Sequence, residues 1–224
     1  MRVRNVHTAR TARSRLSSFD RLVIAADSAL RASFGEAPRA SRASPADQRP
    51  DSDLDDDARQ LSARLMRINH SGEVAAQALY QGQAMTARTR GLRRALWRAA
   101  REEHDHLAWC AERVHELGGK PSALNFLWYA GSYAIGALAG LTGDRNSLGF
   151  IAETERQVVE HLAGHLERLP ADDARSRALL ERMQDDEARH GQDAERAGGA
   201  PLPAPIQELM RATARVMTGT AYWI

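Results

Sequence analysis

Cysteine and lysine are nearly absent from this 224-residue sequence. The one cysteine, Cys110, excludes an intramolecular disulfide and any zinc or iron–sulfur site built from cysteines within one chain, and it fits a reducing compartment. Lys120 is the only lysine, so nearly all of the 31 basic residues are arginines. The formal net charge of +2 is spread along the chain, and no basic stripe indicates a nucleic-acid partner.

The sequence also shows no pattern typical of a secretory signal, and no stretch of distinct composition indicates a second domain. The first residues, MRVRNVHTARTARSRL, are basic without any acid, but no apolar core follows them. We predict a disordered basic arm over residues 1–17, with a wrongly assigned start codon or a targeting segment as alternatives. Residues 18–224 have the size of a single domain. Within this domain, residues 35–55 are rich in proline, serine, alanine and aspartate and predict a flexible linker.

Patterns typical of β-strands are scarce, whereas apolar residues recur every three to four positions over long stretches. Glycine pairs follow Leu117 and Ala197, where helices are expected to end, and Asp172 is a candidate N-cap. The sequence therefore predicts an all-α fold, a four-helix bundle with additional helices. The expected helices cover residues 18–33, 55–89, 91–117, 145–169, 172–197 and 206–224.

Two of these helices carry the same polar insertion in an apolar stripe. Glu103 and His106 interrupt the stripe of one helix, between apolar residues on either side. Glu187 and His190 interrupt the stripe of the other in the same way. Because residues three apart lie on one face of a helix, each pair can point both side chains at the same place in the core.

Each Glu-x-x-His helix follows a helix with a single acid in its apolar stripe. Glu73 lies 30 residues before Glu103, and Glu155 lies 32 residues before Glu187. Glu153 is the only rival to Glu155, and it falls off the stripe. Four carboxylates in an apolar core would be strongly destabilising unless positive charge meets them, and no arginine lies on these stripes.

Two divalent cations would neutralise the four carboxylates. Oxygen-rich ligation with one imidazole per metal suits iron or manganese better than zinc or copper. The arrangement is typical of ferritin-like di-iron or di-manganese carboxylate bundles, a template that is already well described. The predicted metal ligands are Glu73, Glu103, His106, Glu155, Glu187 and His190.

Three further residues could support this site. Glu102 lies four residues before His106, and Asp186 lies four residues before His190. We predict that each carboxylate orients the histidine of its own helix, as outer acceptors commonly do, with ordinary surface acids as the alternative. His70, one turn before Glu73, is a further candidate for lining the site.

Four motifs together resemble a known family. They are RINHSGEVAAQALYQGQ around Glu73, EEHDHL, GFIAETERQVVEHLAGHL around Glu155, and DDEARHG. In this order they are similar to those of the demethoxyubiquinone hydroxylases, also called 3-demethoxyubiquinol 3-hydroxylases, of ubiquinone biosynthesis. The resemblance covers residues 18–224 but not the arginine-rich start.

The resemblance implies a ferritin-like di-iron monooxygenase, with two iron ions per chain and O2 as co-substrate. It implies that the ring of a polyprenyl demethoxy-benzoquinol is hydroxylated at a metal centre held by the six predicted ligands, with no catalytic group beyond these ligands. It also implies peripheral binding to a membrane surface, which we expect to be the cytoplasmic side of a bacterial inner membrane. Partner proteins of ubiquinone biosynthesis and a homo-oligomer are compatible with this expectation.

An uncharged segment over residues 121–143 fits such a substrate. Ala123 to Leu141 would form a helix of about 28 Å, close to the thickness of a bilayer core. Its glycines, tyrosines and Asn125 favour a helix lying in the interface, or lining a channel for the prenyl tail, over a spanning helix. The amphipathic C-terminus supports the same interpretation. The main alternative function is a ferritin-like iron store or ferroxidase, which shares the ligands but does not need these apolar segments.

Overall fold

The computed structural model describes residues 39–224. The predicted basic arm and the predicted helix over residues 18–33 lie outside the described residues. The described part contains a short 3-10 helix and six α-helices and no strand, which confirms the predicted all-α fold. These elements are η1 (Pro45–Gln48), α2 (Asp56–Thr86), α3 (Arg90–Glu116), α4 (Asn125–Leu141), α5 (Asp144–Arg168), α6 (Ala174–Arg196) and α7 (Ala204–Ala221).

The predicted helices over the described residues lie within three residues of the observed bounds. Gly118 and Gly198 end α3 and α6 with φ of 73° and 94°, a backbone conformation that glycine adopts without strain. The predicted N-cap at Asp172 is wrong by one residue. Asp173 caps α6 instead, because its side chain accepts a hydrogen bond from the backbone N–H of Ser176 and also contacts Arg113 of α3.

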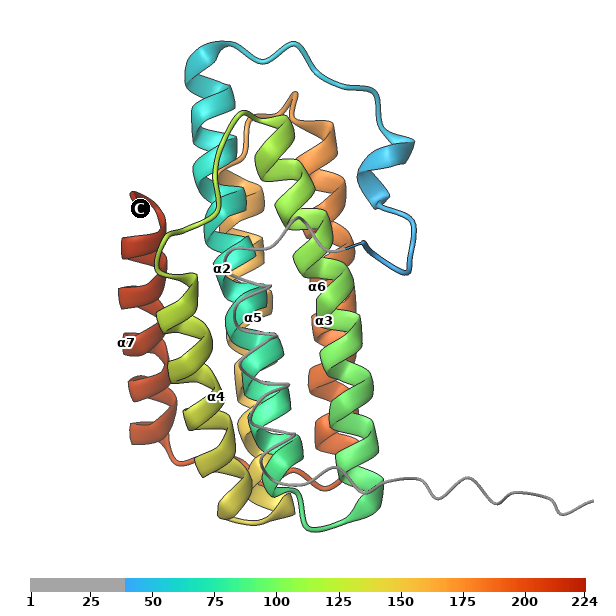
Figure 1. Cartoon of the computed structure of the whole chain (residues 1–224), viewed down its shortest axis with the longest axis vertical. Coiled ribbons are helices and arrows are strands. Elements are labelled where there is room, and N and C mark those ends of the chain that lie inside the picture. The colour runs from blue at the N-terminus through green and yellow to red at the C-terminus, as the bar shows by residue number, and fades with distance from the viewer. Residues whose placement is uncertain (1–38) are drawn as a thin grey trace, which may run out of the picture.

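The long helices α2, α3, α5 and α6 form the bundle, with α4 and α7 on one side of it (Figure 1). Two apolar clusters fill the two ends of the bundle core. One contains Met66, Trp109, Leu162 and Met183, and the other contains Tyr80, Leu96, Ile151 and Ala194. The six predicted ligands lie between these clusters, so apolar layers close the site from both ends and keep water away from it.

Helix α4 packs directly on α2 through glycines. A Cβ at Gly136 would lie 2.3 Å from the backbone oxygen of Leu79, and a Cβ at Gly82 would lie 2.2 Å from that of Tyr133. The two backbones therefore touch, which explains the glycines in this uncharged segment. None of the described helices is both long and apolar enough to cross a membrane.

Residues 39–54 were expected to form part of a flexible linker, whereas the structure fixes them to the bundle. The backbone N–H of Ser41 donates to Oδ1 of Asp105 on α3 over 2.6 Å. Ala46 and Leu54 are buried against the apolar core. This segment brings Arg42 to the outer face of α3 and α6, where it becomes part of the site described below.

Candidate metal centre

The six predicted ligand residues meet halfway along the bundle, one acid from each of α2 and α5 and a Glu-x-x-His pair from each of α3 and α6. All six are buried. Their ligand atoms form two groups in which all atoms lie within 4.8 Å of one another. The first group is Glu73, Glu103, His106 and Glu187, and the second is Glu155, Glu187 and His190.

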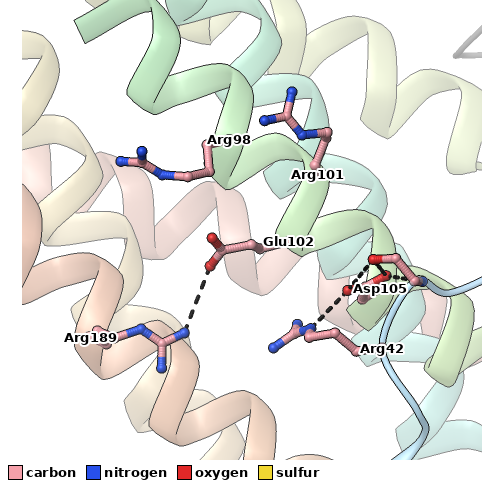
Figure 2. Close-up of a pocket in the computed structure, with 7 residues that line it drawn as sticks. Arg42, Arg98, Arg101, Glu102, Asp105 and Arg189 are labelled. Carbon is pink, nitrogen blue, oxygen red and sulfur yellow. Dashed lines mark hydrogen bonds and ion pairs between the residues drawn. The ribbon is translucent and has the colours of Figure 1, made fainter. Parts of the chain in front are cut away.

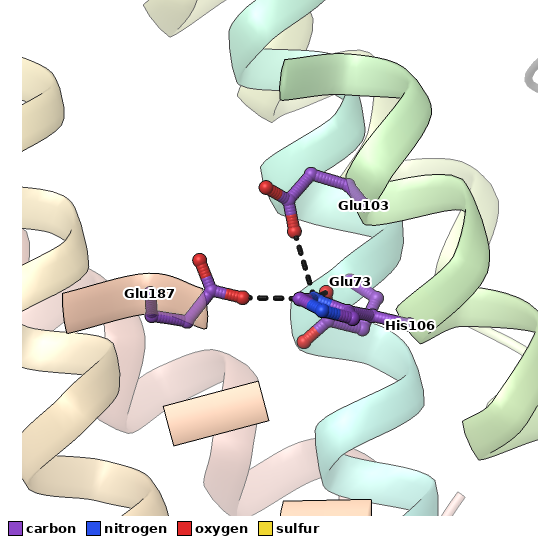
Figure 3. A group of neighbouring side chains, drawn as sticks. All are labelled: Glu73, Glu103, His106 and Glu187. Atoms are coloured by element: carbon purple, nitrogen blue, oxygen red, sulfur yellow. Dashed lines mark hydrogen bonds and ion pairs between the residues drawn. The ribbon is translucent and has the colours of Figure 1, made fainter. Parts of the chain in front are cut away.

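Carboxylates surround the inward nitrogen of His106 (Figure 3). Its Nδ1 lies 2.9 Å from Oε1 of Glu187, 3.2 Å from Oε2 of Glu103 and 3.6 Å from Oε2 of Glu73. The inward nitrogen of His190 has a matching environment, with Oε2 of Glu187 at 3.1 Å and Oε1 of Glu103 at 3.2 Å. Glu103 and Glu187 therefore each direct one carboxylate oxygen at His106 and the other at His190.

The outward nitrogens contact carboxylates from the opposite helix. His106 Nε2 on α3 lies 3.1 Å from Oδ2 of Asp186 on α6, and His190 Nε2 on α6 lies 2.8 Å from Oε2 of Glu102 on α3. The prediction that each acid orients the histidine of its own helix is therefore wrong. Because residues four apart share a helix face, each carboxylate points with its own histidine toward the opposite helix, where it contacts the other imidazole.

The residues present fit a pair of cations. Each histidine directs Nε2 outward at one carboxylate and Nδ1 inward at several carboxylate oxygens, so the centre of the cluster requires positive charge, which two cations bound by the Nδ1 atoms and the carboxylates would supply. Several of these oxygens lack a hydrogen bond among the described residues, which is unusual for buried polar atoms. They are Oε2 of Glu73, Oε1 of Glu103 and Oε1 of Glu187.

The titration behaviour of these groups shows the same demand for positive charge. Burial raises the pKa of Glu73 to about 8 and the pKa of Glu155 well above its usual range, where Glu187 and Glu103 add to the effect. Burial lowers the pKa of His190, but the adjacent carboxylates of Glu103 and Glu187 outweigh this effect and raise the pKa to about 12. Positive charge is thus stabilised at the centre of the cluster and negative charge is in excess there.

Three arginines surround Asp186, the outer partner of His106. Arg42 Nη1 lies 2.7 Å from Oδ2, and Arg189 and Arg182 lie 2.8 Å and 3.1 Å from Oδ1. Burial would raise the pKa of Asp186, but hydrogen bonds from His106 and from Arg42 hold it well below its usual value. Sequence reasoning missed Arg42, since no local pattern links a loop residue to an acid 144 positions later.

Tyr80 is a second residue that the sequence analysis did not assign to the site. Its hydroxyl donates a 2.5 Å hydrogen bond to Oε1 of Glu155, and its ring meets that of His190 edge-on at 6.4 Å between centroids. A signal for it was present, because Tyr80 lies seven residues after Glu73 and therefore on the same face of α2.

The remaining candidates lie outside the cluster. Glu153 turns toward Arg156 of its own helix and Arg211 of α7, so it does not compete with Glu155. His70 does not join the carboxylate groups, since its Nδ1 lies 3.2 Å from the side-chain nitrogen of Asn125 on α4.

Comparison with known proteins identifies the family. The family described as ubiquinone biosynthesis protein COQ7 matches residues 60–221. The chain belongs to this family. A relative in Cupriavidus necator is 61% identical over 207 residues, covering 92% of this chain and all of the relative. One in Nitrosococcus oceani is 57% identical over 210 residues, covering 94% of this chain and 98% of the relative. Both relatives are named 3-demethoxyubiquinol 3-hydroxylase.

Membership of the COQ7 family agrees with the resemblance noted from the four motifs. A solved structure supports the fold independently, namely the dodecameric thioferritin of Bacteroides fragilis, with a TM-score of 0.50 and 19% sequence identity. The match covers 71% of this chain and 90% of the thioferritin. At this identity the likeness shows a shared ferritin-like bundle and nothing about function.

Proposed function

We propose that this COQ7-family protein is an O2-dependent di-iron monooxygenase that hydroxylates the ring of a polyprenyl demethoxy-benzoquinol, 2-polyprenyl-3-methyl-6-methoxy-1,4-benzoquinol, a late step of ubiquinone biosynthesis. The observation that carries the proposal is the buried cluster of four carboxylates and two imidazoles whose inward nitrogens face acceptors only. The names of relatives more than half identical over nearly their whole length support the same reaction.

The cluster assigns different roles to its acids. Glu103 and Glu187 each approach both histidines, whereas Glu73 and Glu155 each belong to one ligand group, and together with the imidazoles these acids would hold the iron. When bound, the iron pair supplies the two electrons and the O2 chemistry. The protein holds the ligands through Asp186, Glu102 and Tyr80, and its two apolar clusters exclude water.

We propose a direction from which the quinol ring approaches this cluster. The α3–α6 side presents the outer carboxylates and their arginines, a charged environment that disfavours an apolar ring. A recess of about 10 Å³ between α2 and α5 reaches Glu155, and it would have to widen to admit the ring. It is lined by Ala76, Leu79, Tyr80, Gln83, Ile151, Thr154 and Glu155. We propose that the ring enters on this side, which α4 and α7 flank.

A membrane surface is the proposed source of the substrate. All large hydrophobic side chains that are exposed in the described part of the chain lie on α4, on α7 or directly after α7. Both helices occupy the same side of the bundle (Figure 1). A clustered apolar surface of this kind is typical of interfacial binding. The exposed residues are Phe126, Leu127, Ile135, Leu138, Leu141, Ile206, Leu209, Val216, Trp223 and Ile224.

This surface favours the hydroxylase over the iron store. An iron-storage cage would expose a polar exterior, whereas Leu138 and Leu209 are 64% and 63% exposed.

We also propose that the protein binds peripherally to the cytoplasmic side of the inner membrane. Three expectations from the sequence stay predictions. They are a single domain over residues 18–224, protein partners of ubiquinone biosynthesis, and a homo-oligomer.

The experiment that tests the proposal is elemental analysis of anaerobically purified protein, followed by turnover of the demethoxy-quinol under O2. We expect about two irons per chain, falling to one or none in a Glu103→Ala, His106→Ala variant that keeps its helical circular dichroism. Iron that accumulates well beyond two per chain without hydroxylated product would favour the storage function. No iron after anaerobic reconstitution would contradict both.

A further inference from the structure

A cavity of about 400 Å³ opens beside α3 and α6, on the side of the bundle away from α4 and α7. Arginines face it from three separate parts of the chain (Figure 2). The size is that of a site for a small molecule. The charged lining consists of Arg42, Arg98, Arg101, Glu102, Asp105 and Arg189.

Positive charge is in excess around this cavity. Arg42 is neutralised by Asp105 and Asp186, at 2.8 Å and 2.7 Å. Arg98 and Arg101 are exposed and form no ion pair with any residue that the structure describes. The buried Nη2 of Arg42 likewise lacks a hydrogen bond among the described residues. Several guanidinium donors thus converge without enough acceptors.

We propose that this cavity binds a phosphate or diphosphate group of a small molecule. Planar guanidinium groups donate paired hydrogen bonds to the oxygens of such anions, and several arginines around one concave site favour two negative charges or more. An anion held by Arg98 and Arg101 would also relieve the repulsion between like charges that now line the cavity. Both free inorganic anions and the diphosphate of a nucleotide offer this chemistry.

The cavity is connected to the proposed metal ligands. Glu102 lines it and contacts His190 Nε2, while Arg189 lies 3.7 Å from Glu102 and 2.8 Å from Asp186. An anion that attracts Arg189 would loosen its contacts with both outer carboxylates, and so alter the hydrogen bonds to both imidazoles. This coupling, unlike the anion site itself, rests on the proposed metal centre.

The binding test uses calorimetric titration of inorganic phosphate into the iron-loaded full chain. An Arg98→Gln, Arg101→Gln variant should bind phosphate at least about tenfold more weakly. The matched control is Arg90→Gln, Arg94→Gln, which removes the same charge from the same helix outside the cavity and should change the affinity less than about twofold. Equal weakening in both variants, or no saturable binding, would overturn the proposal. Because phosphate that chelates iron would act equally on both variants and the wild type, chelation cannot produce the expected difference between them.

Two further titrations sharpen the result. Glu102→Gln removes a negative charge from the lining and should tighten phosphate binding severalfold, whereas weaker binding would contradict the site. ADP identifies the source, since tighter binding than inorganic pyrophosphate indicates a nucleotide and equal binding indicates a free anion. The coupling predicts different phosphate affinities for iron-loaded and metal-free protein. Equal affinities would refute the coupling, and lack of phosphate binding with two irons per chain would leave the proposed function intact.

Discussion

His106 on α3 directs its outward nitrogen, Nε2, at Oδ2 of Asp186 on α6, 3.1 Å away. His190 makes the reciprocal contact with Glu102 on α3. Each Glu-x-x-His helix therefore orients the histidine of the other, and the two helices cannot shift relative to one another without disturbing both imidazoles. The crossed contacts join the two helix pairs of the bundle at the centre of the site.

Removing Asp186 should weaken iron binding. In Asp186→Ala, His106 loses its outer acceptor and three arginines lose their partner, so we expect iron affinity to fall about 10- to 100-fold. The measurement is iron retained against a competing chelator. Asp185→Ala, an exposed neighbour, is the matched control and should behave as wild type. Unchanged iron affinity in Asp186→Ala would show that the contact has no role in holding the metal.

Tyr80→Phe should loosen Glu155 without opening a cavity. The variant keeps the ring but loses the hydrogen bond to the buried carboxylate, which should lower the free energy of unfolding by about 1–3 kcal/mol. Two irons per chain should still bind, because Tyr80 is not a proposed ligand, while quinol turnover should fall. Urea unfolding, iron analysis and turnover check the three parts, and wild-type stability together with wild-type turnover would contradict the role.

Two glycines of α4 should respond in opposite ways to alanine. In Gly136→Ala the new methyl group would clash with the backbone of Leu79, so we expect destabilisation by about 1–3 kcal/mol. In Gly131→Ala nothing lies within 4 Å of the new Cβ, and the better helix former should stabilise the protein by about 0.5–1 kcal/mol. Thermal unfolding of both variants tests the close packing of α4 on α2, and similar melting temperatures would contradict it.

Acid should destabilise the protein partly through His165. Burial lowers its pKa to about 2, so the imidazole is neutral in the folded state, where its Nδ1–H donates a 2.9 Å hydrogen bond to Oδ1 of Asn69. The stabilisation is complete above the unfolded pKa of about 6.5 and is lost as pH falls below it, by up to about 1.4 kcal/mol per pH unit. Urea unfolding between pH 7 and pH 5 should show a shallower pH dependence for His165→Gln. Identical slopes would contradict the assignment.

Charge placed on the exposed apolar surface should abolish membrane binding. Leu138→Glu, Leu209→Glu changes two exposed side chains on α4 and α7, so folding should be unaffected while flotation with anionic vesicles is lost. Gln60→Glu, Gln192→Glu adds the same charge at exposed positions of α2 and α6 and should float as wild type. Equal loss in both variants would indicate a general charge effect rather than a specific surface.

The sequence by itself determined the long helices over the described residues, the six residues of the cluster and the preference for Glu155 over Glu153. These features are local, because residues three and four apart share a helix face whatever the helix packs against. The same periodicity placed Tyr80 on the face of Glu73, although its contact with Glu155 could not be read from it.

Only the tertiary structure decided which acid orients which histidine, which arginines surround Asp186, and which face of the uncharged segment is buried. The contact between His106 and Asp186 spans 80 positions, and that between Arg42 and Asp186 spans 144. Local spacing says where a side chain points on its own helix, but not what stands opposite. The opposing residue depends on the axial register of α3 and α6 and on the path of residues 39–54, which the packing of the whole core fixes.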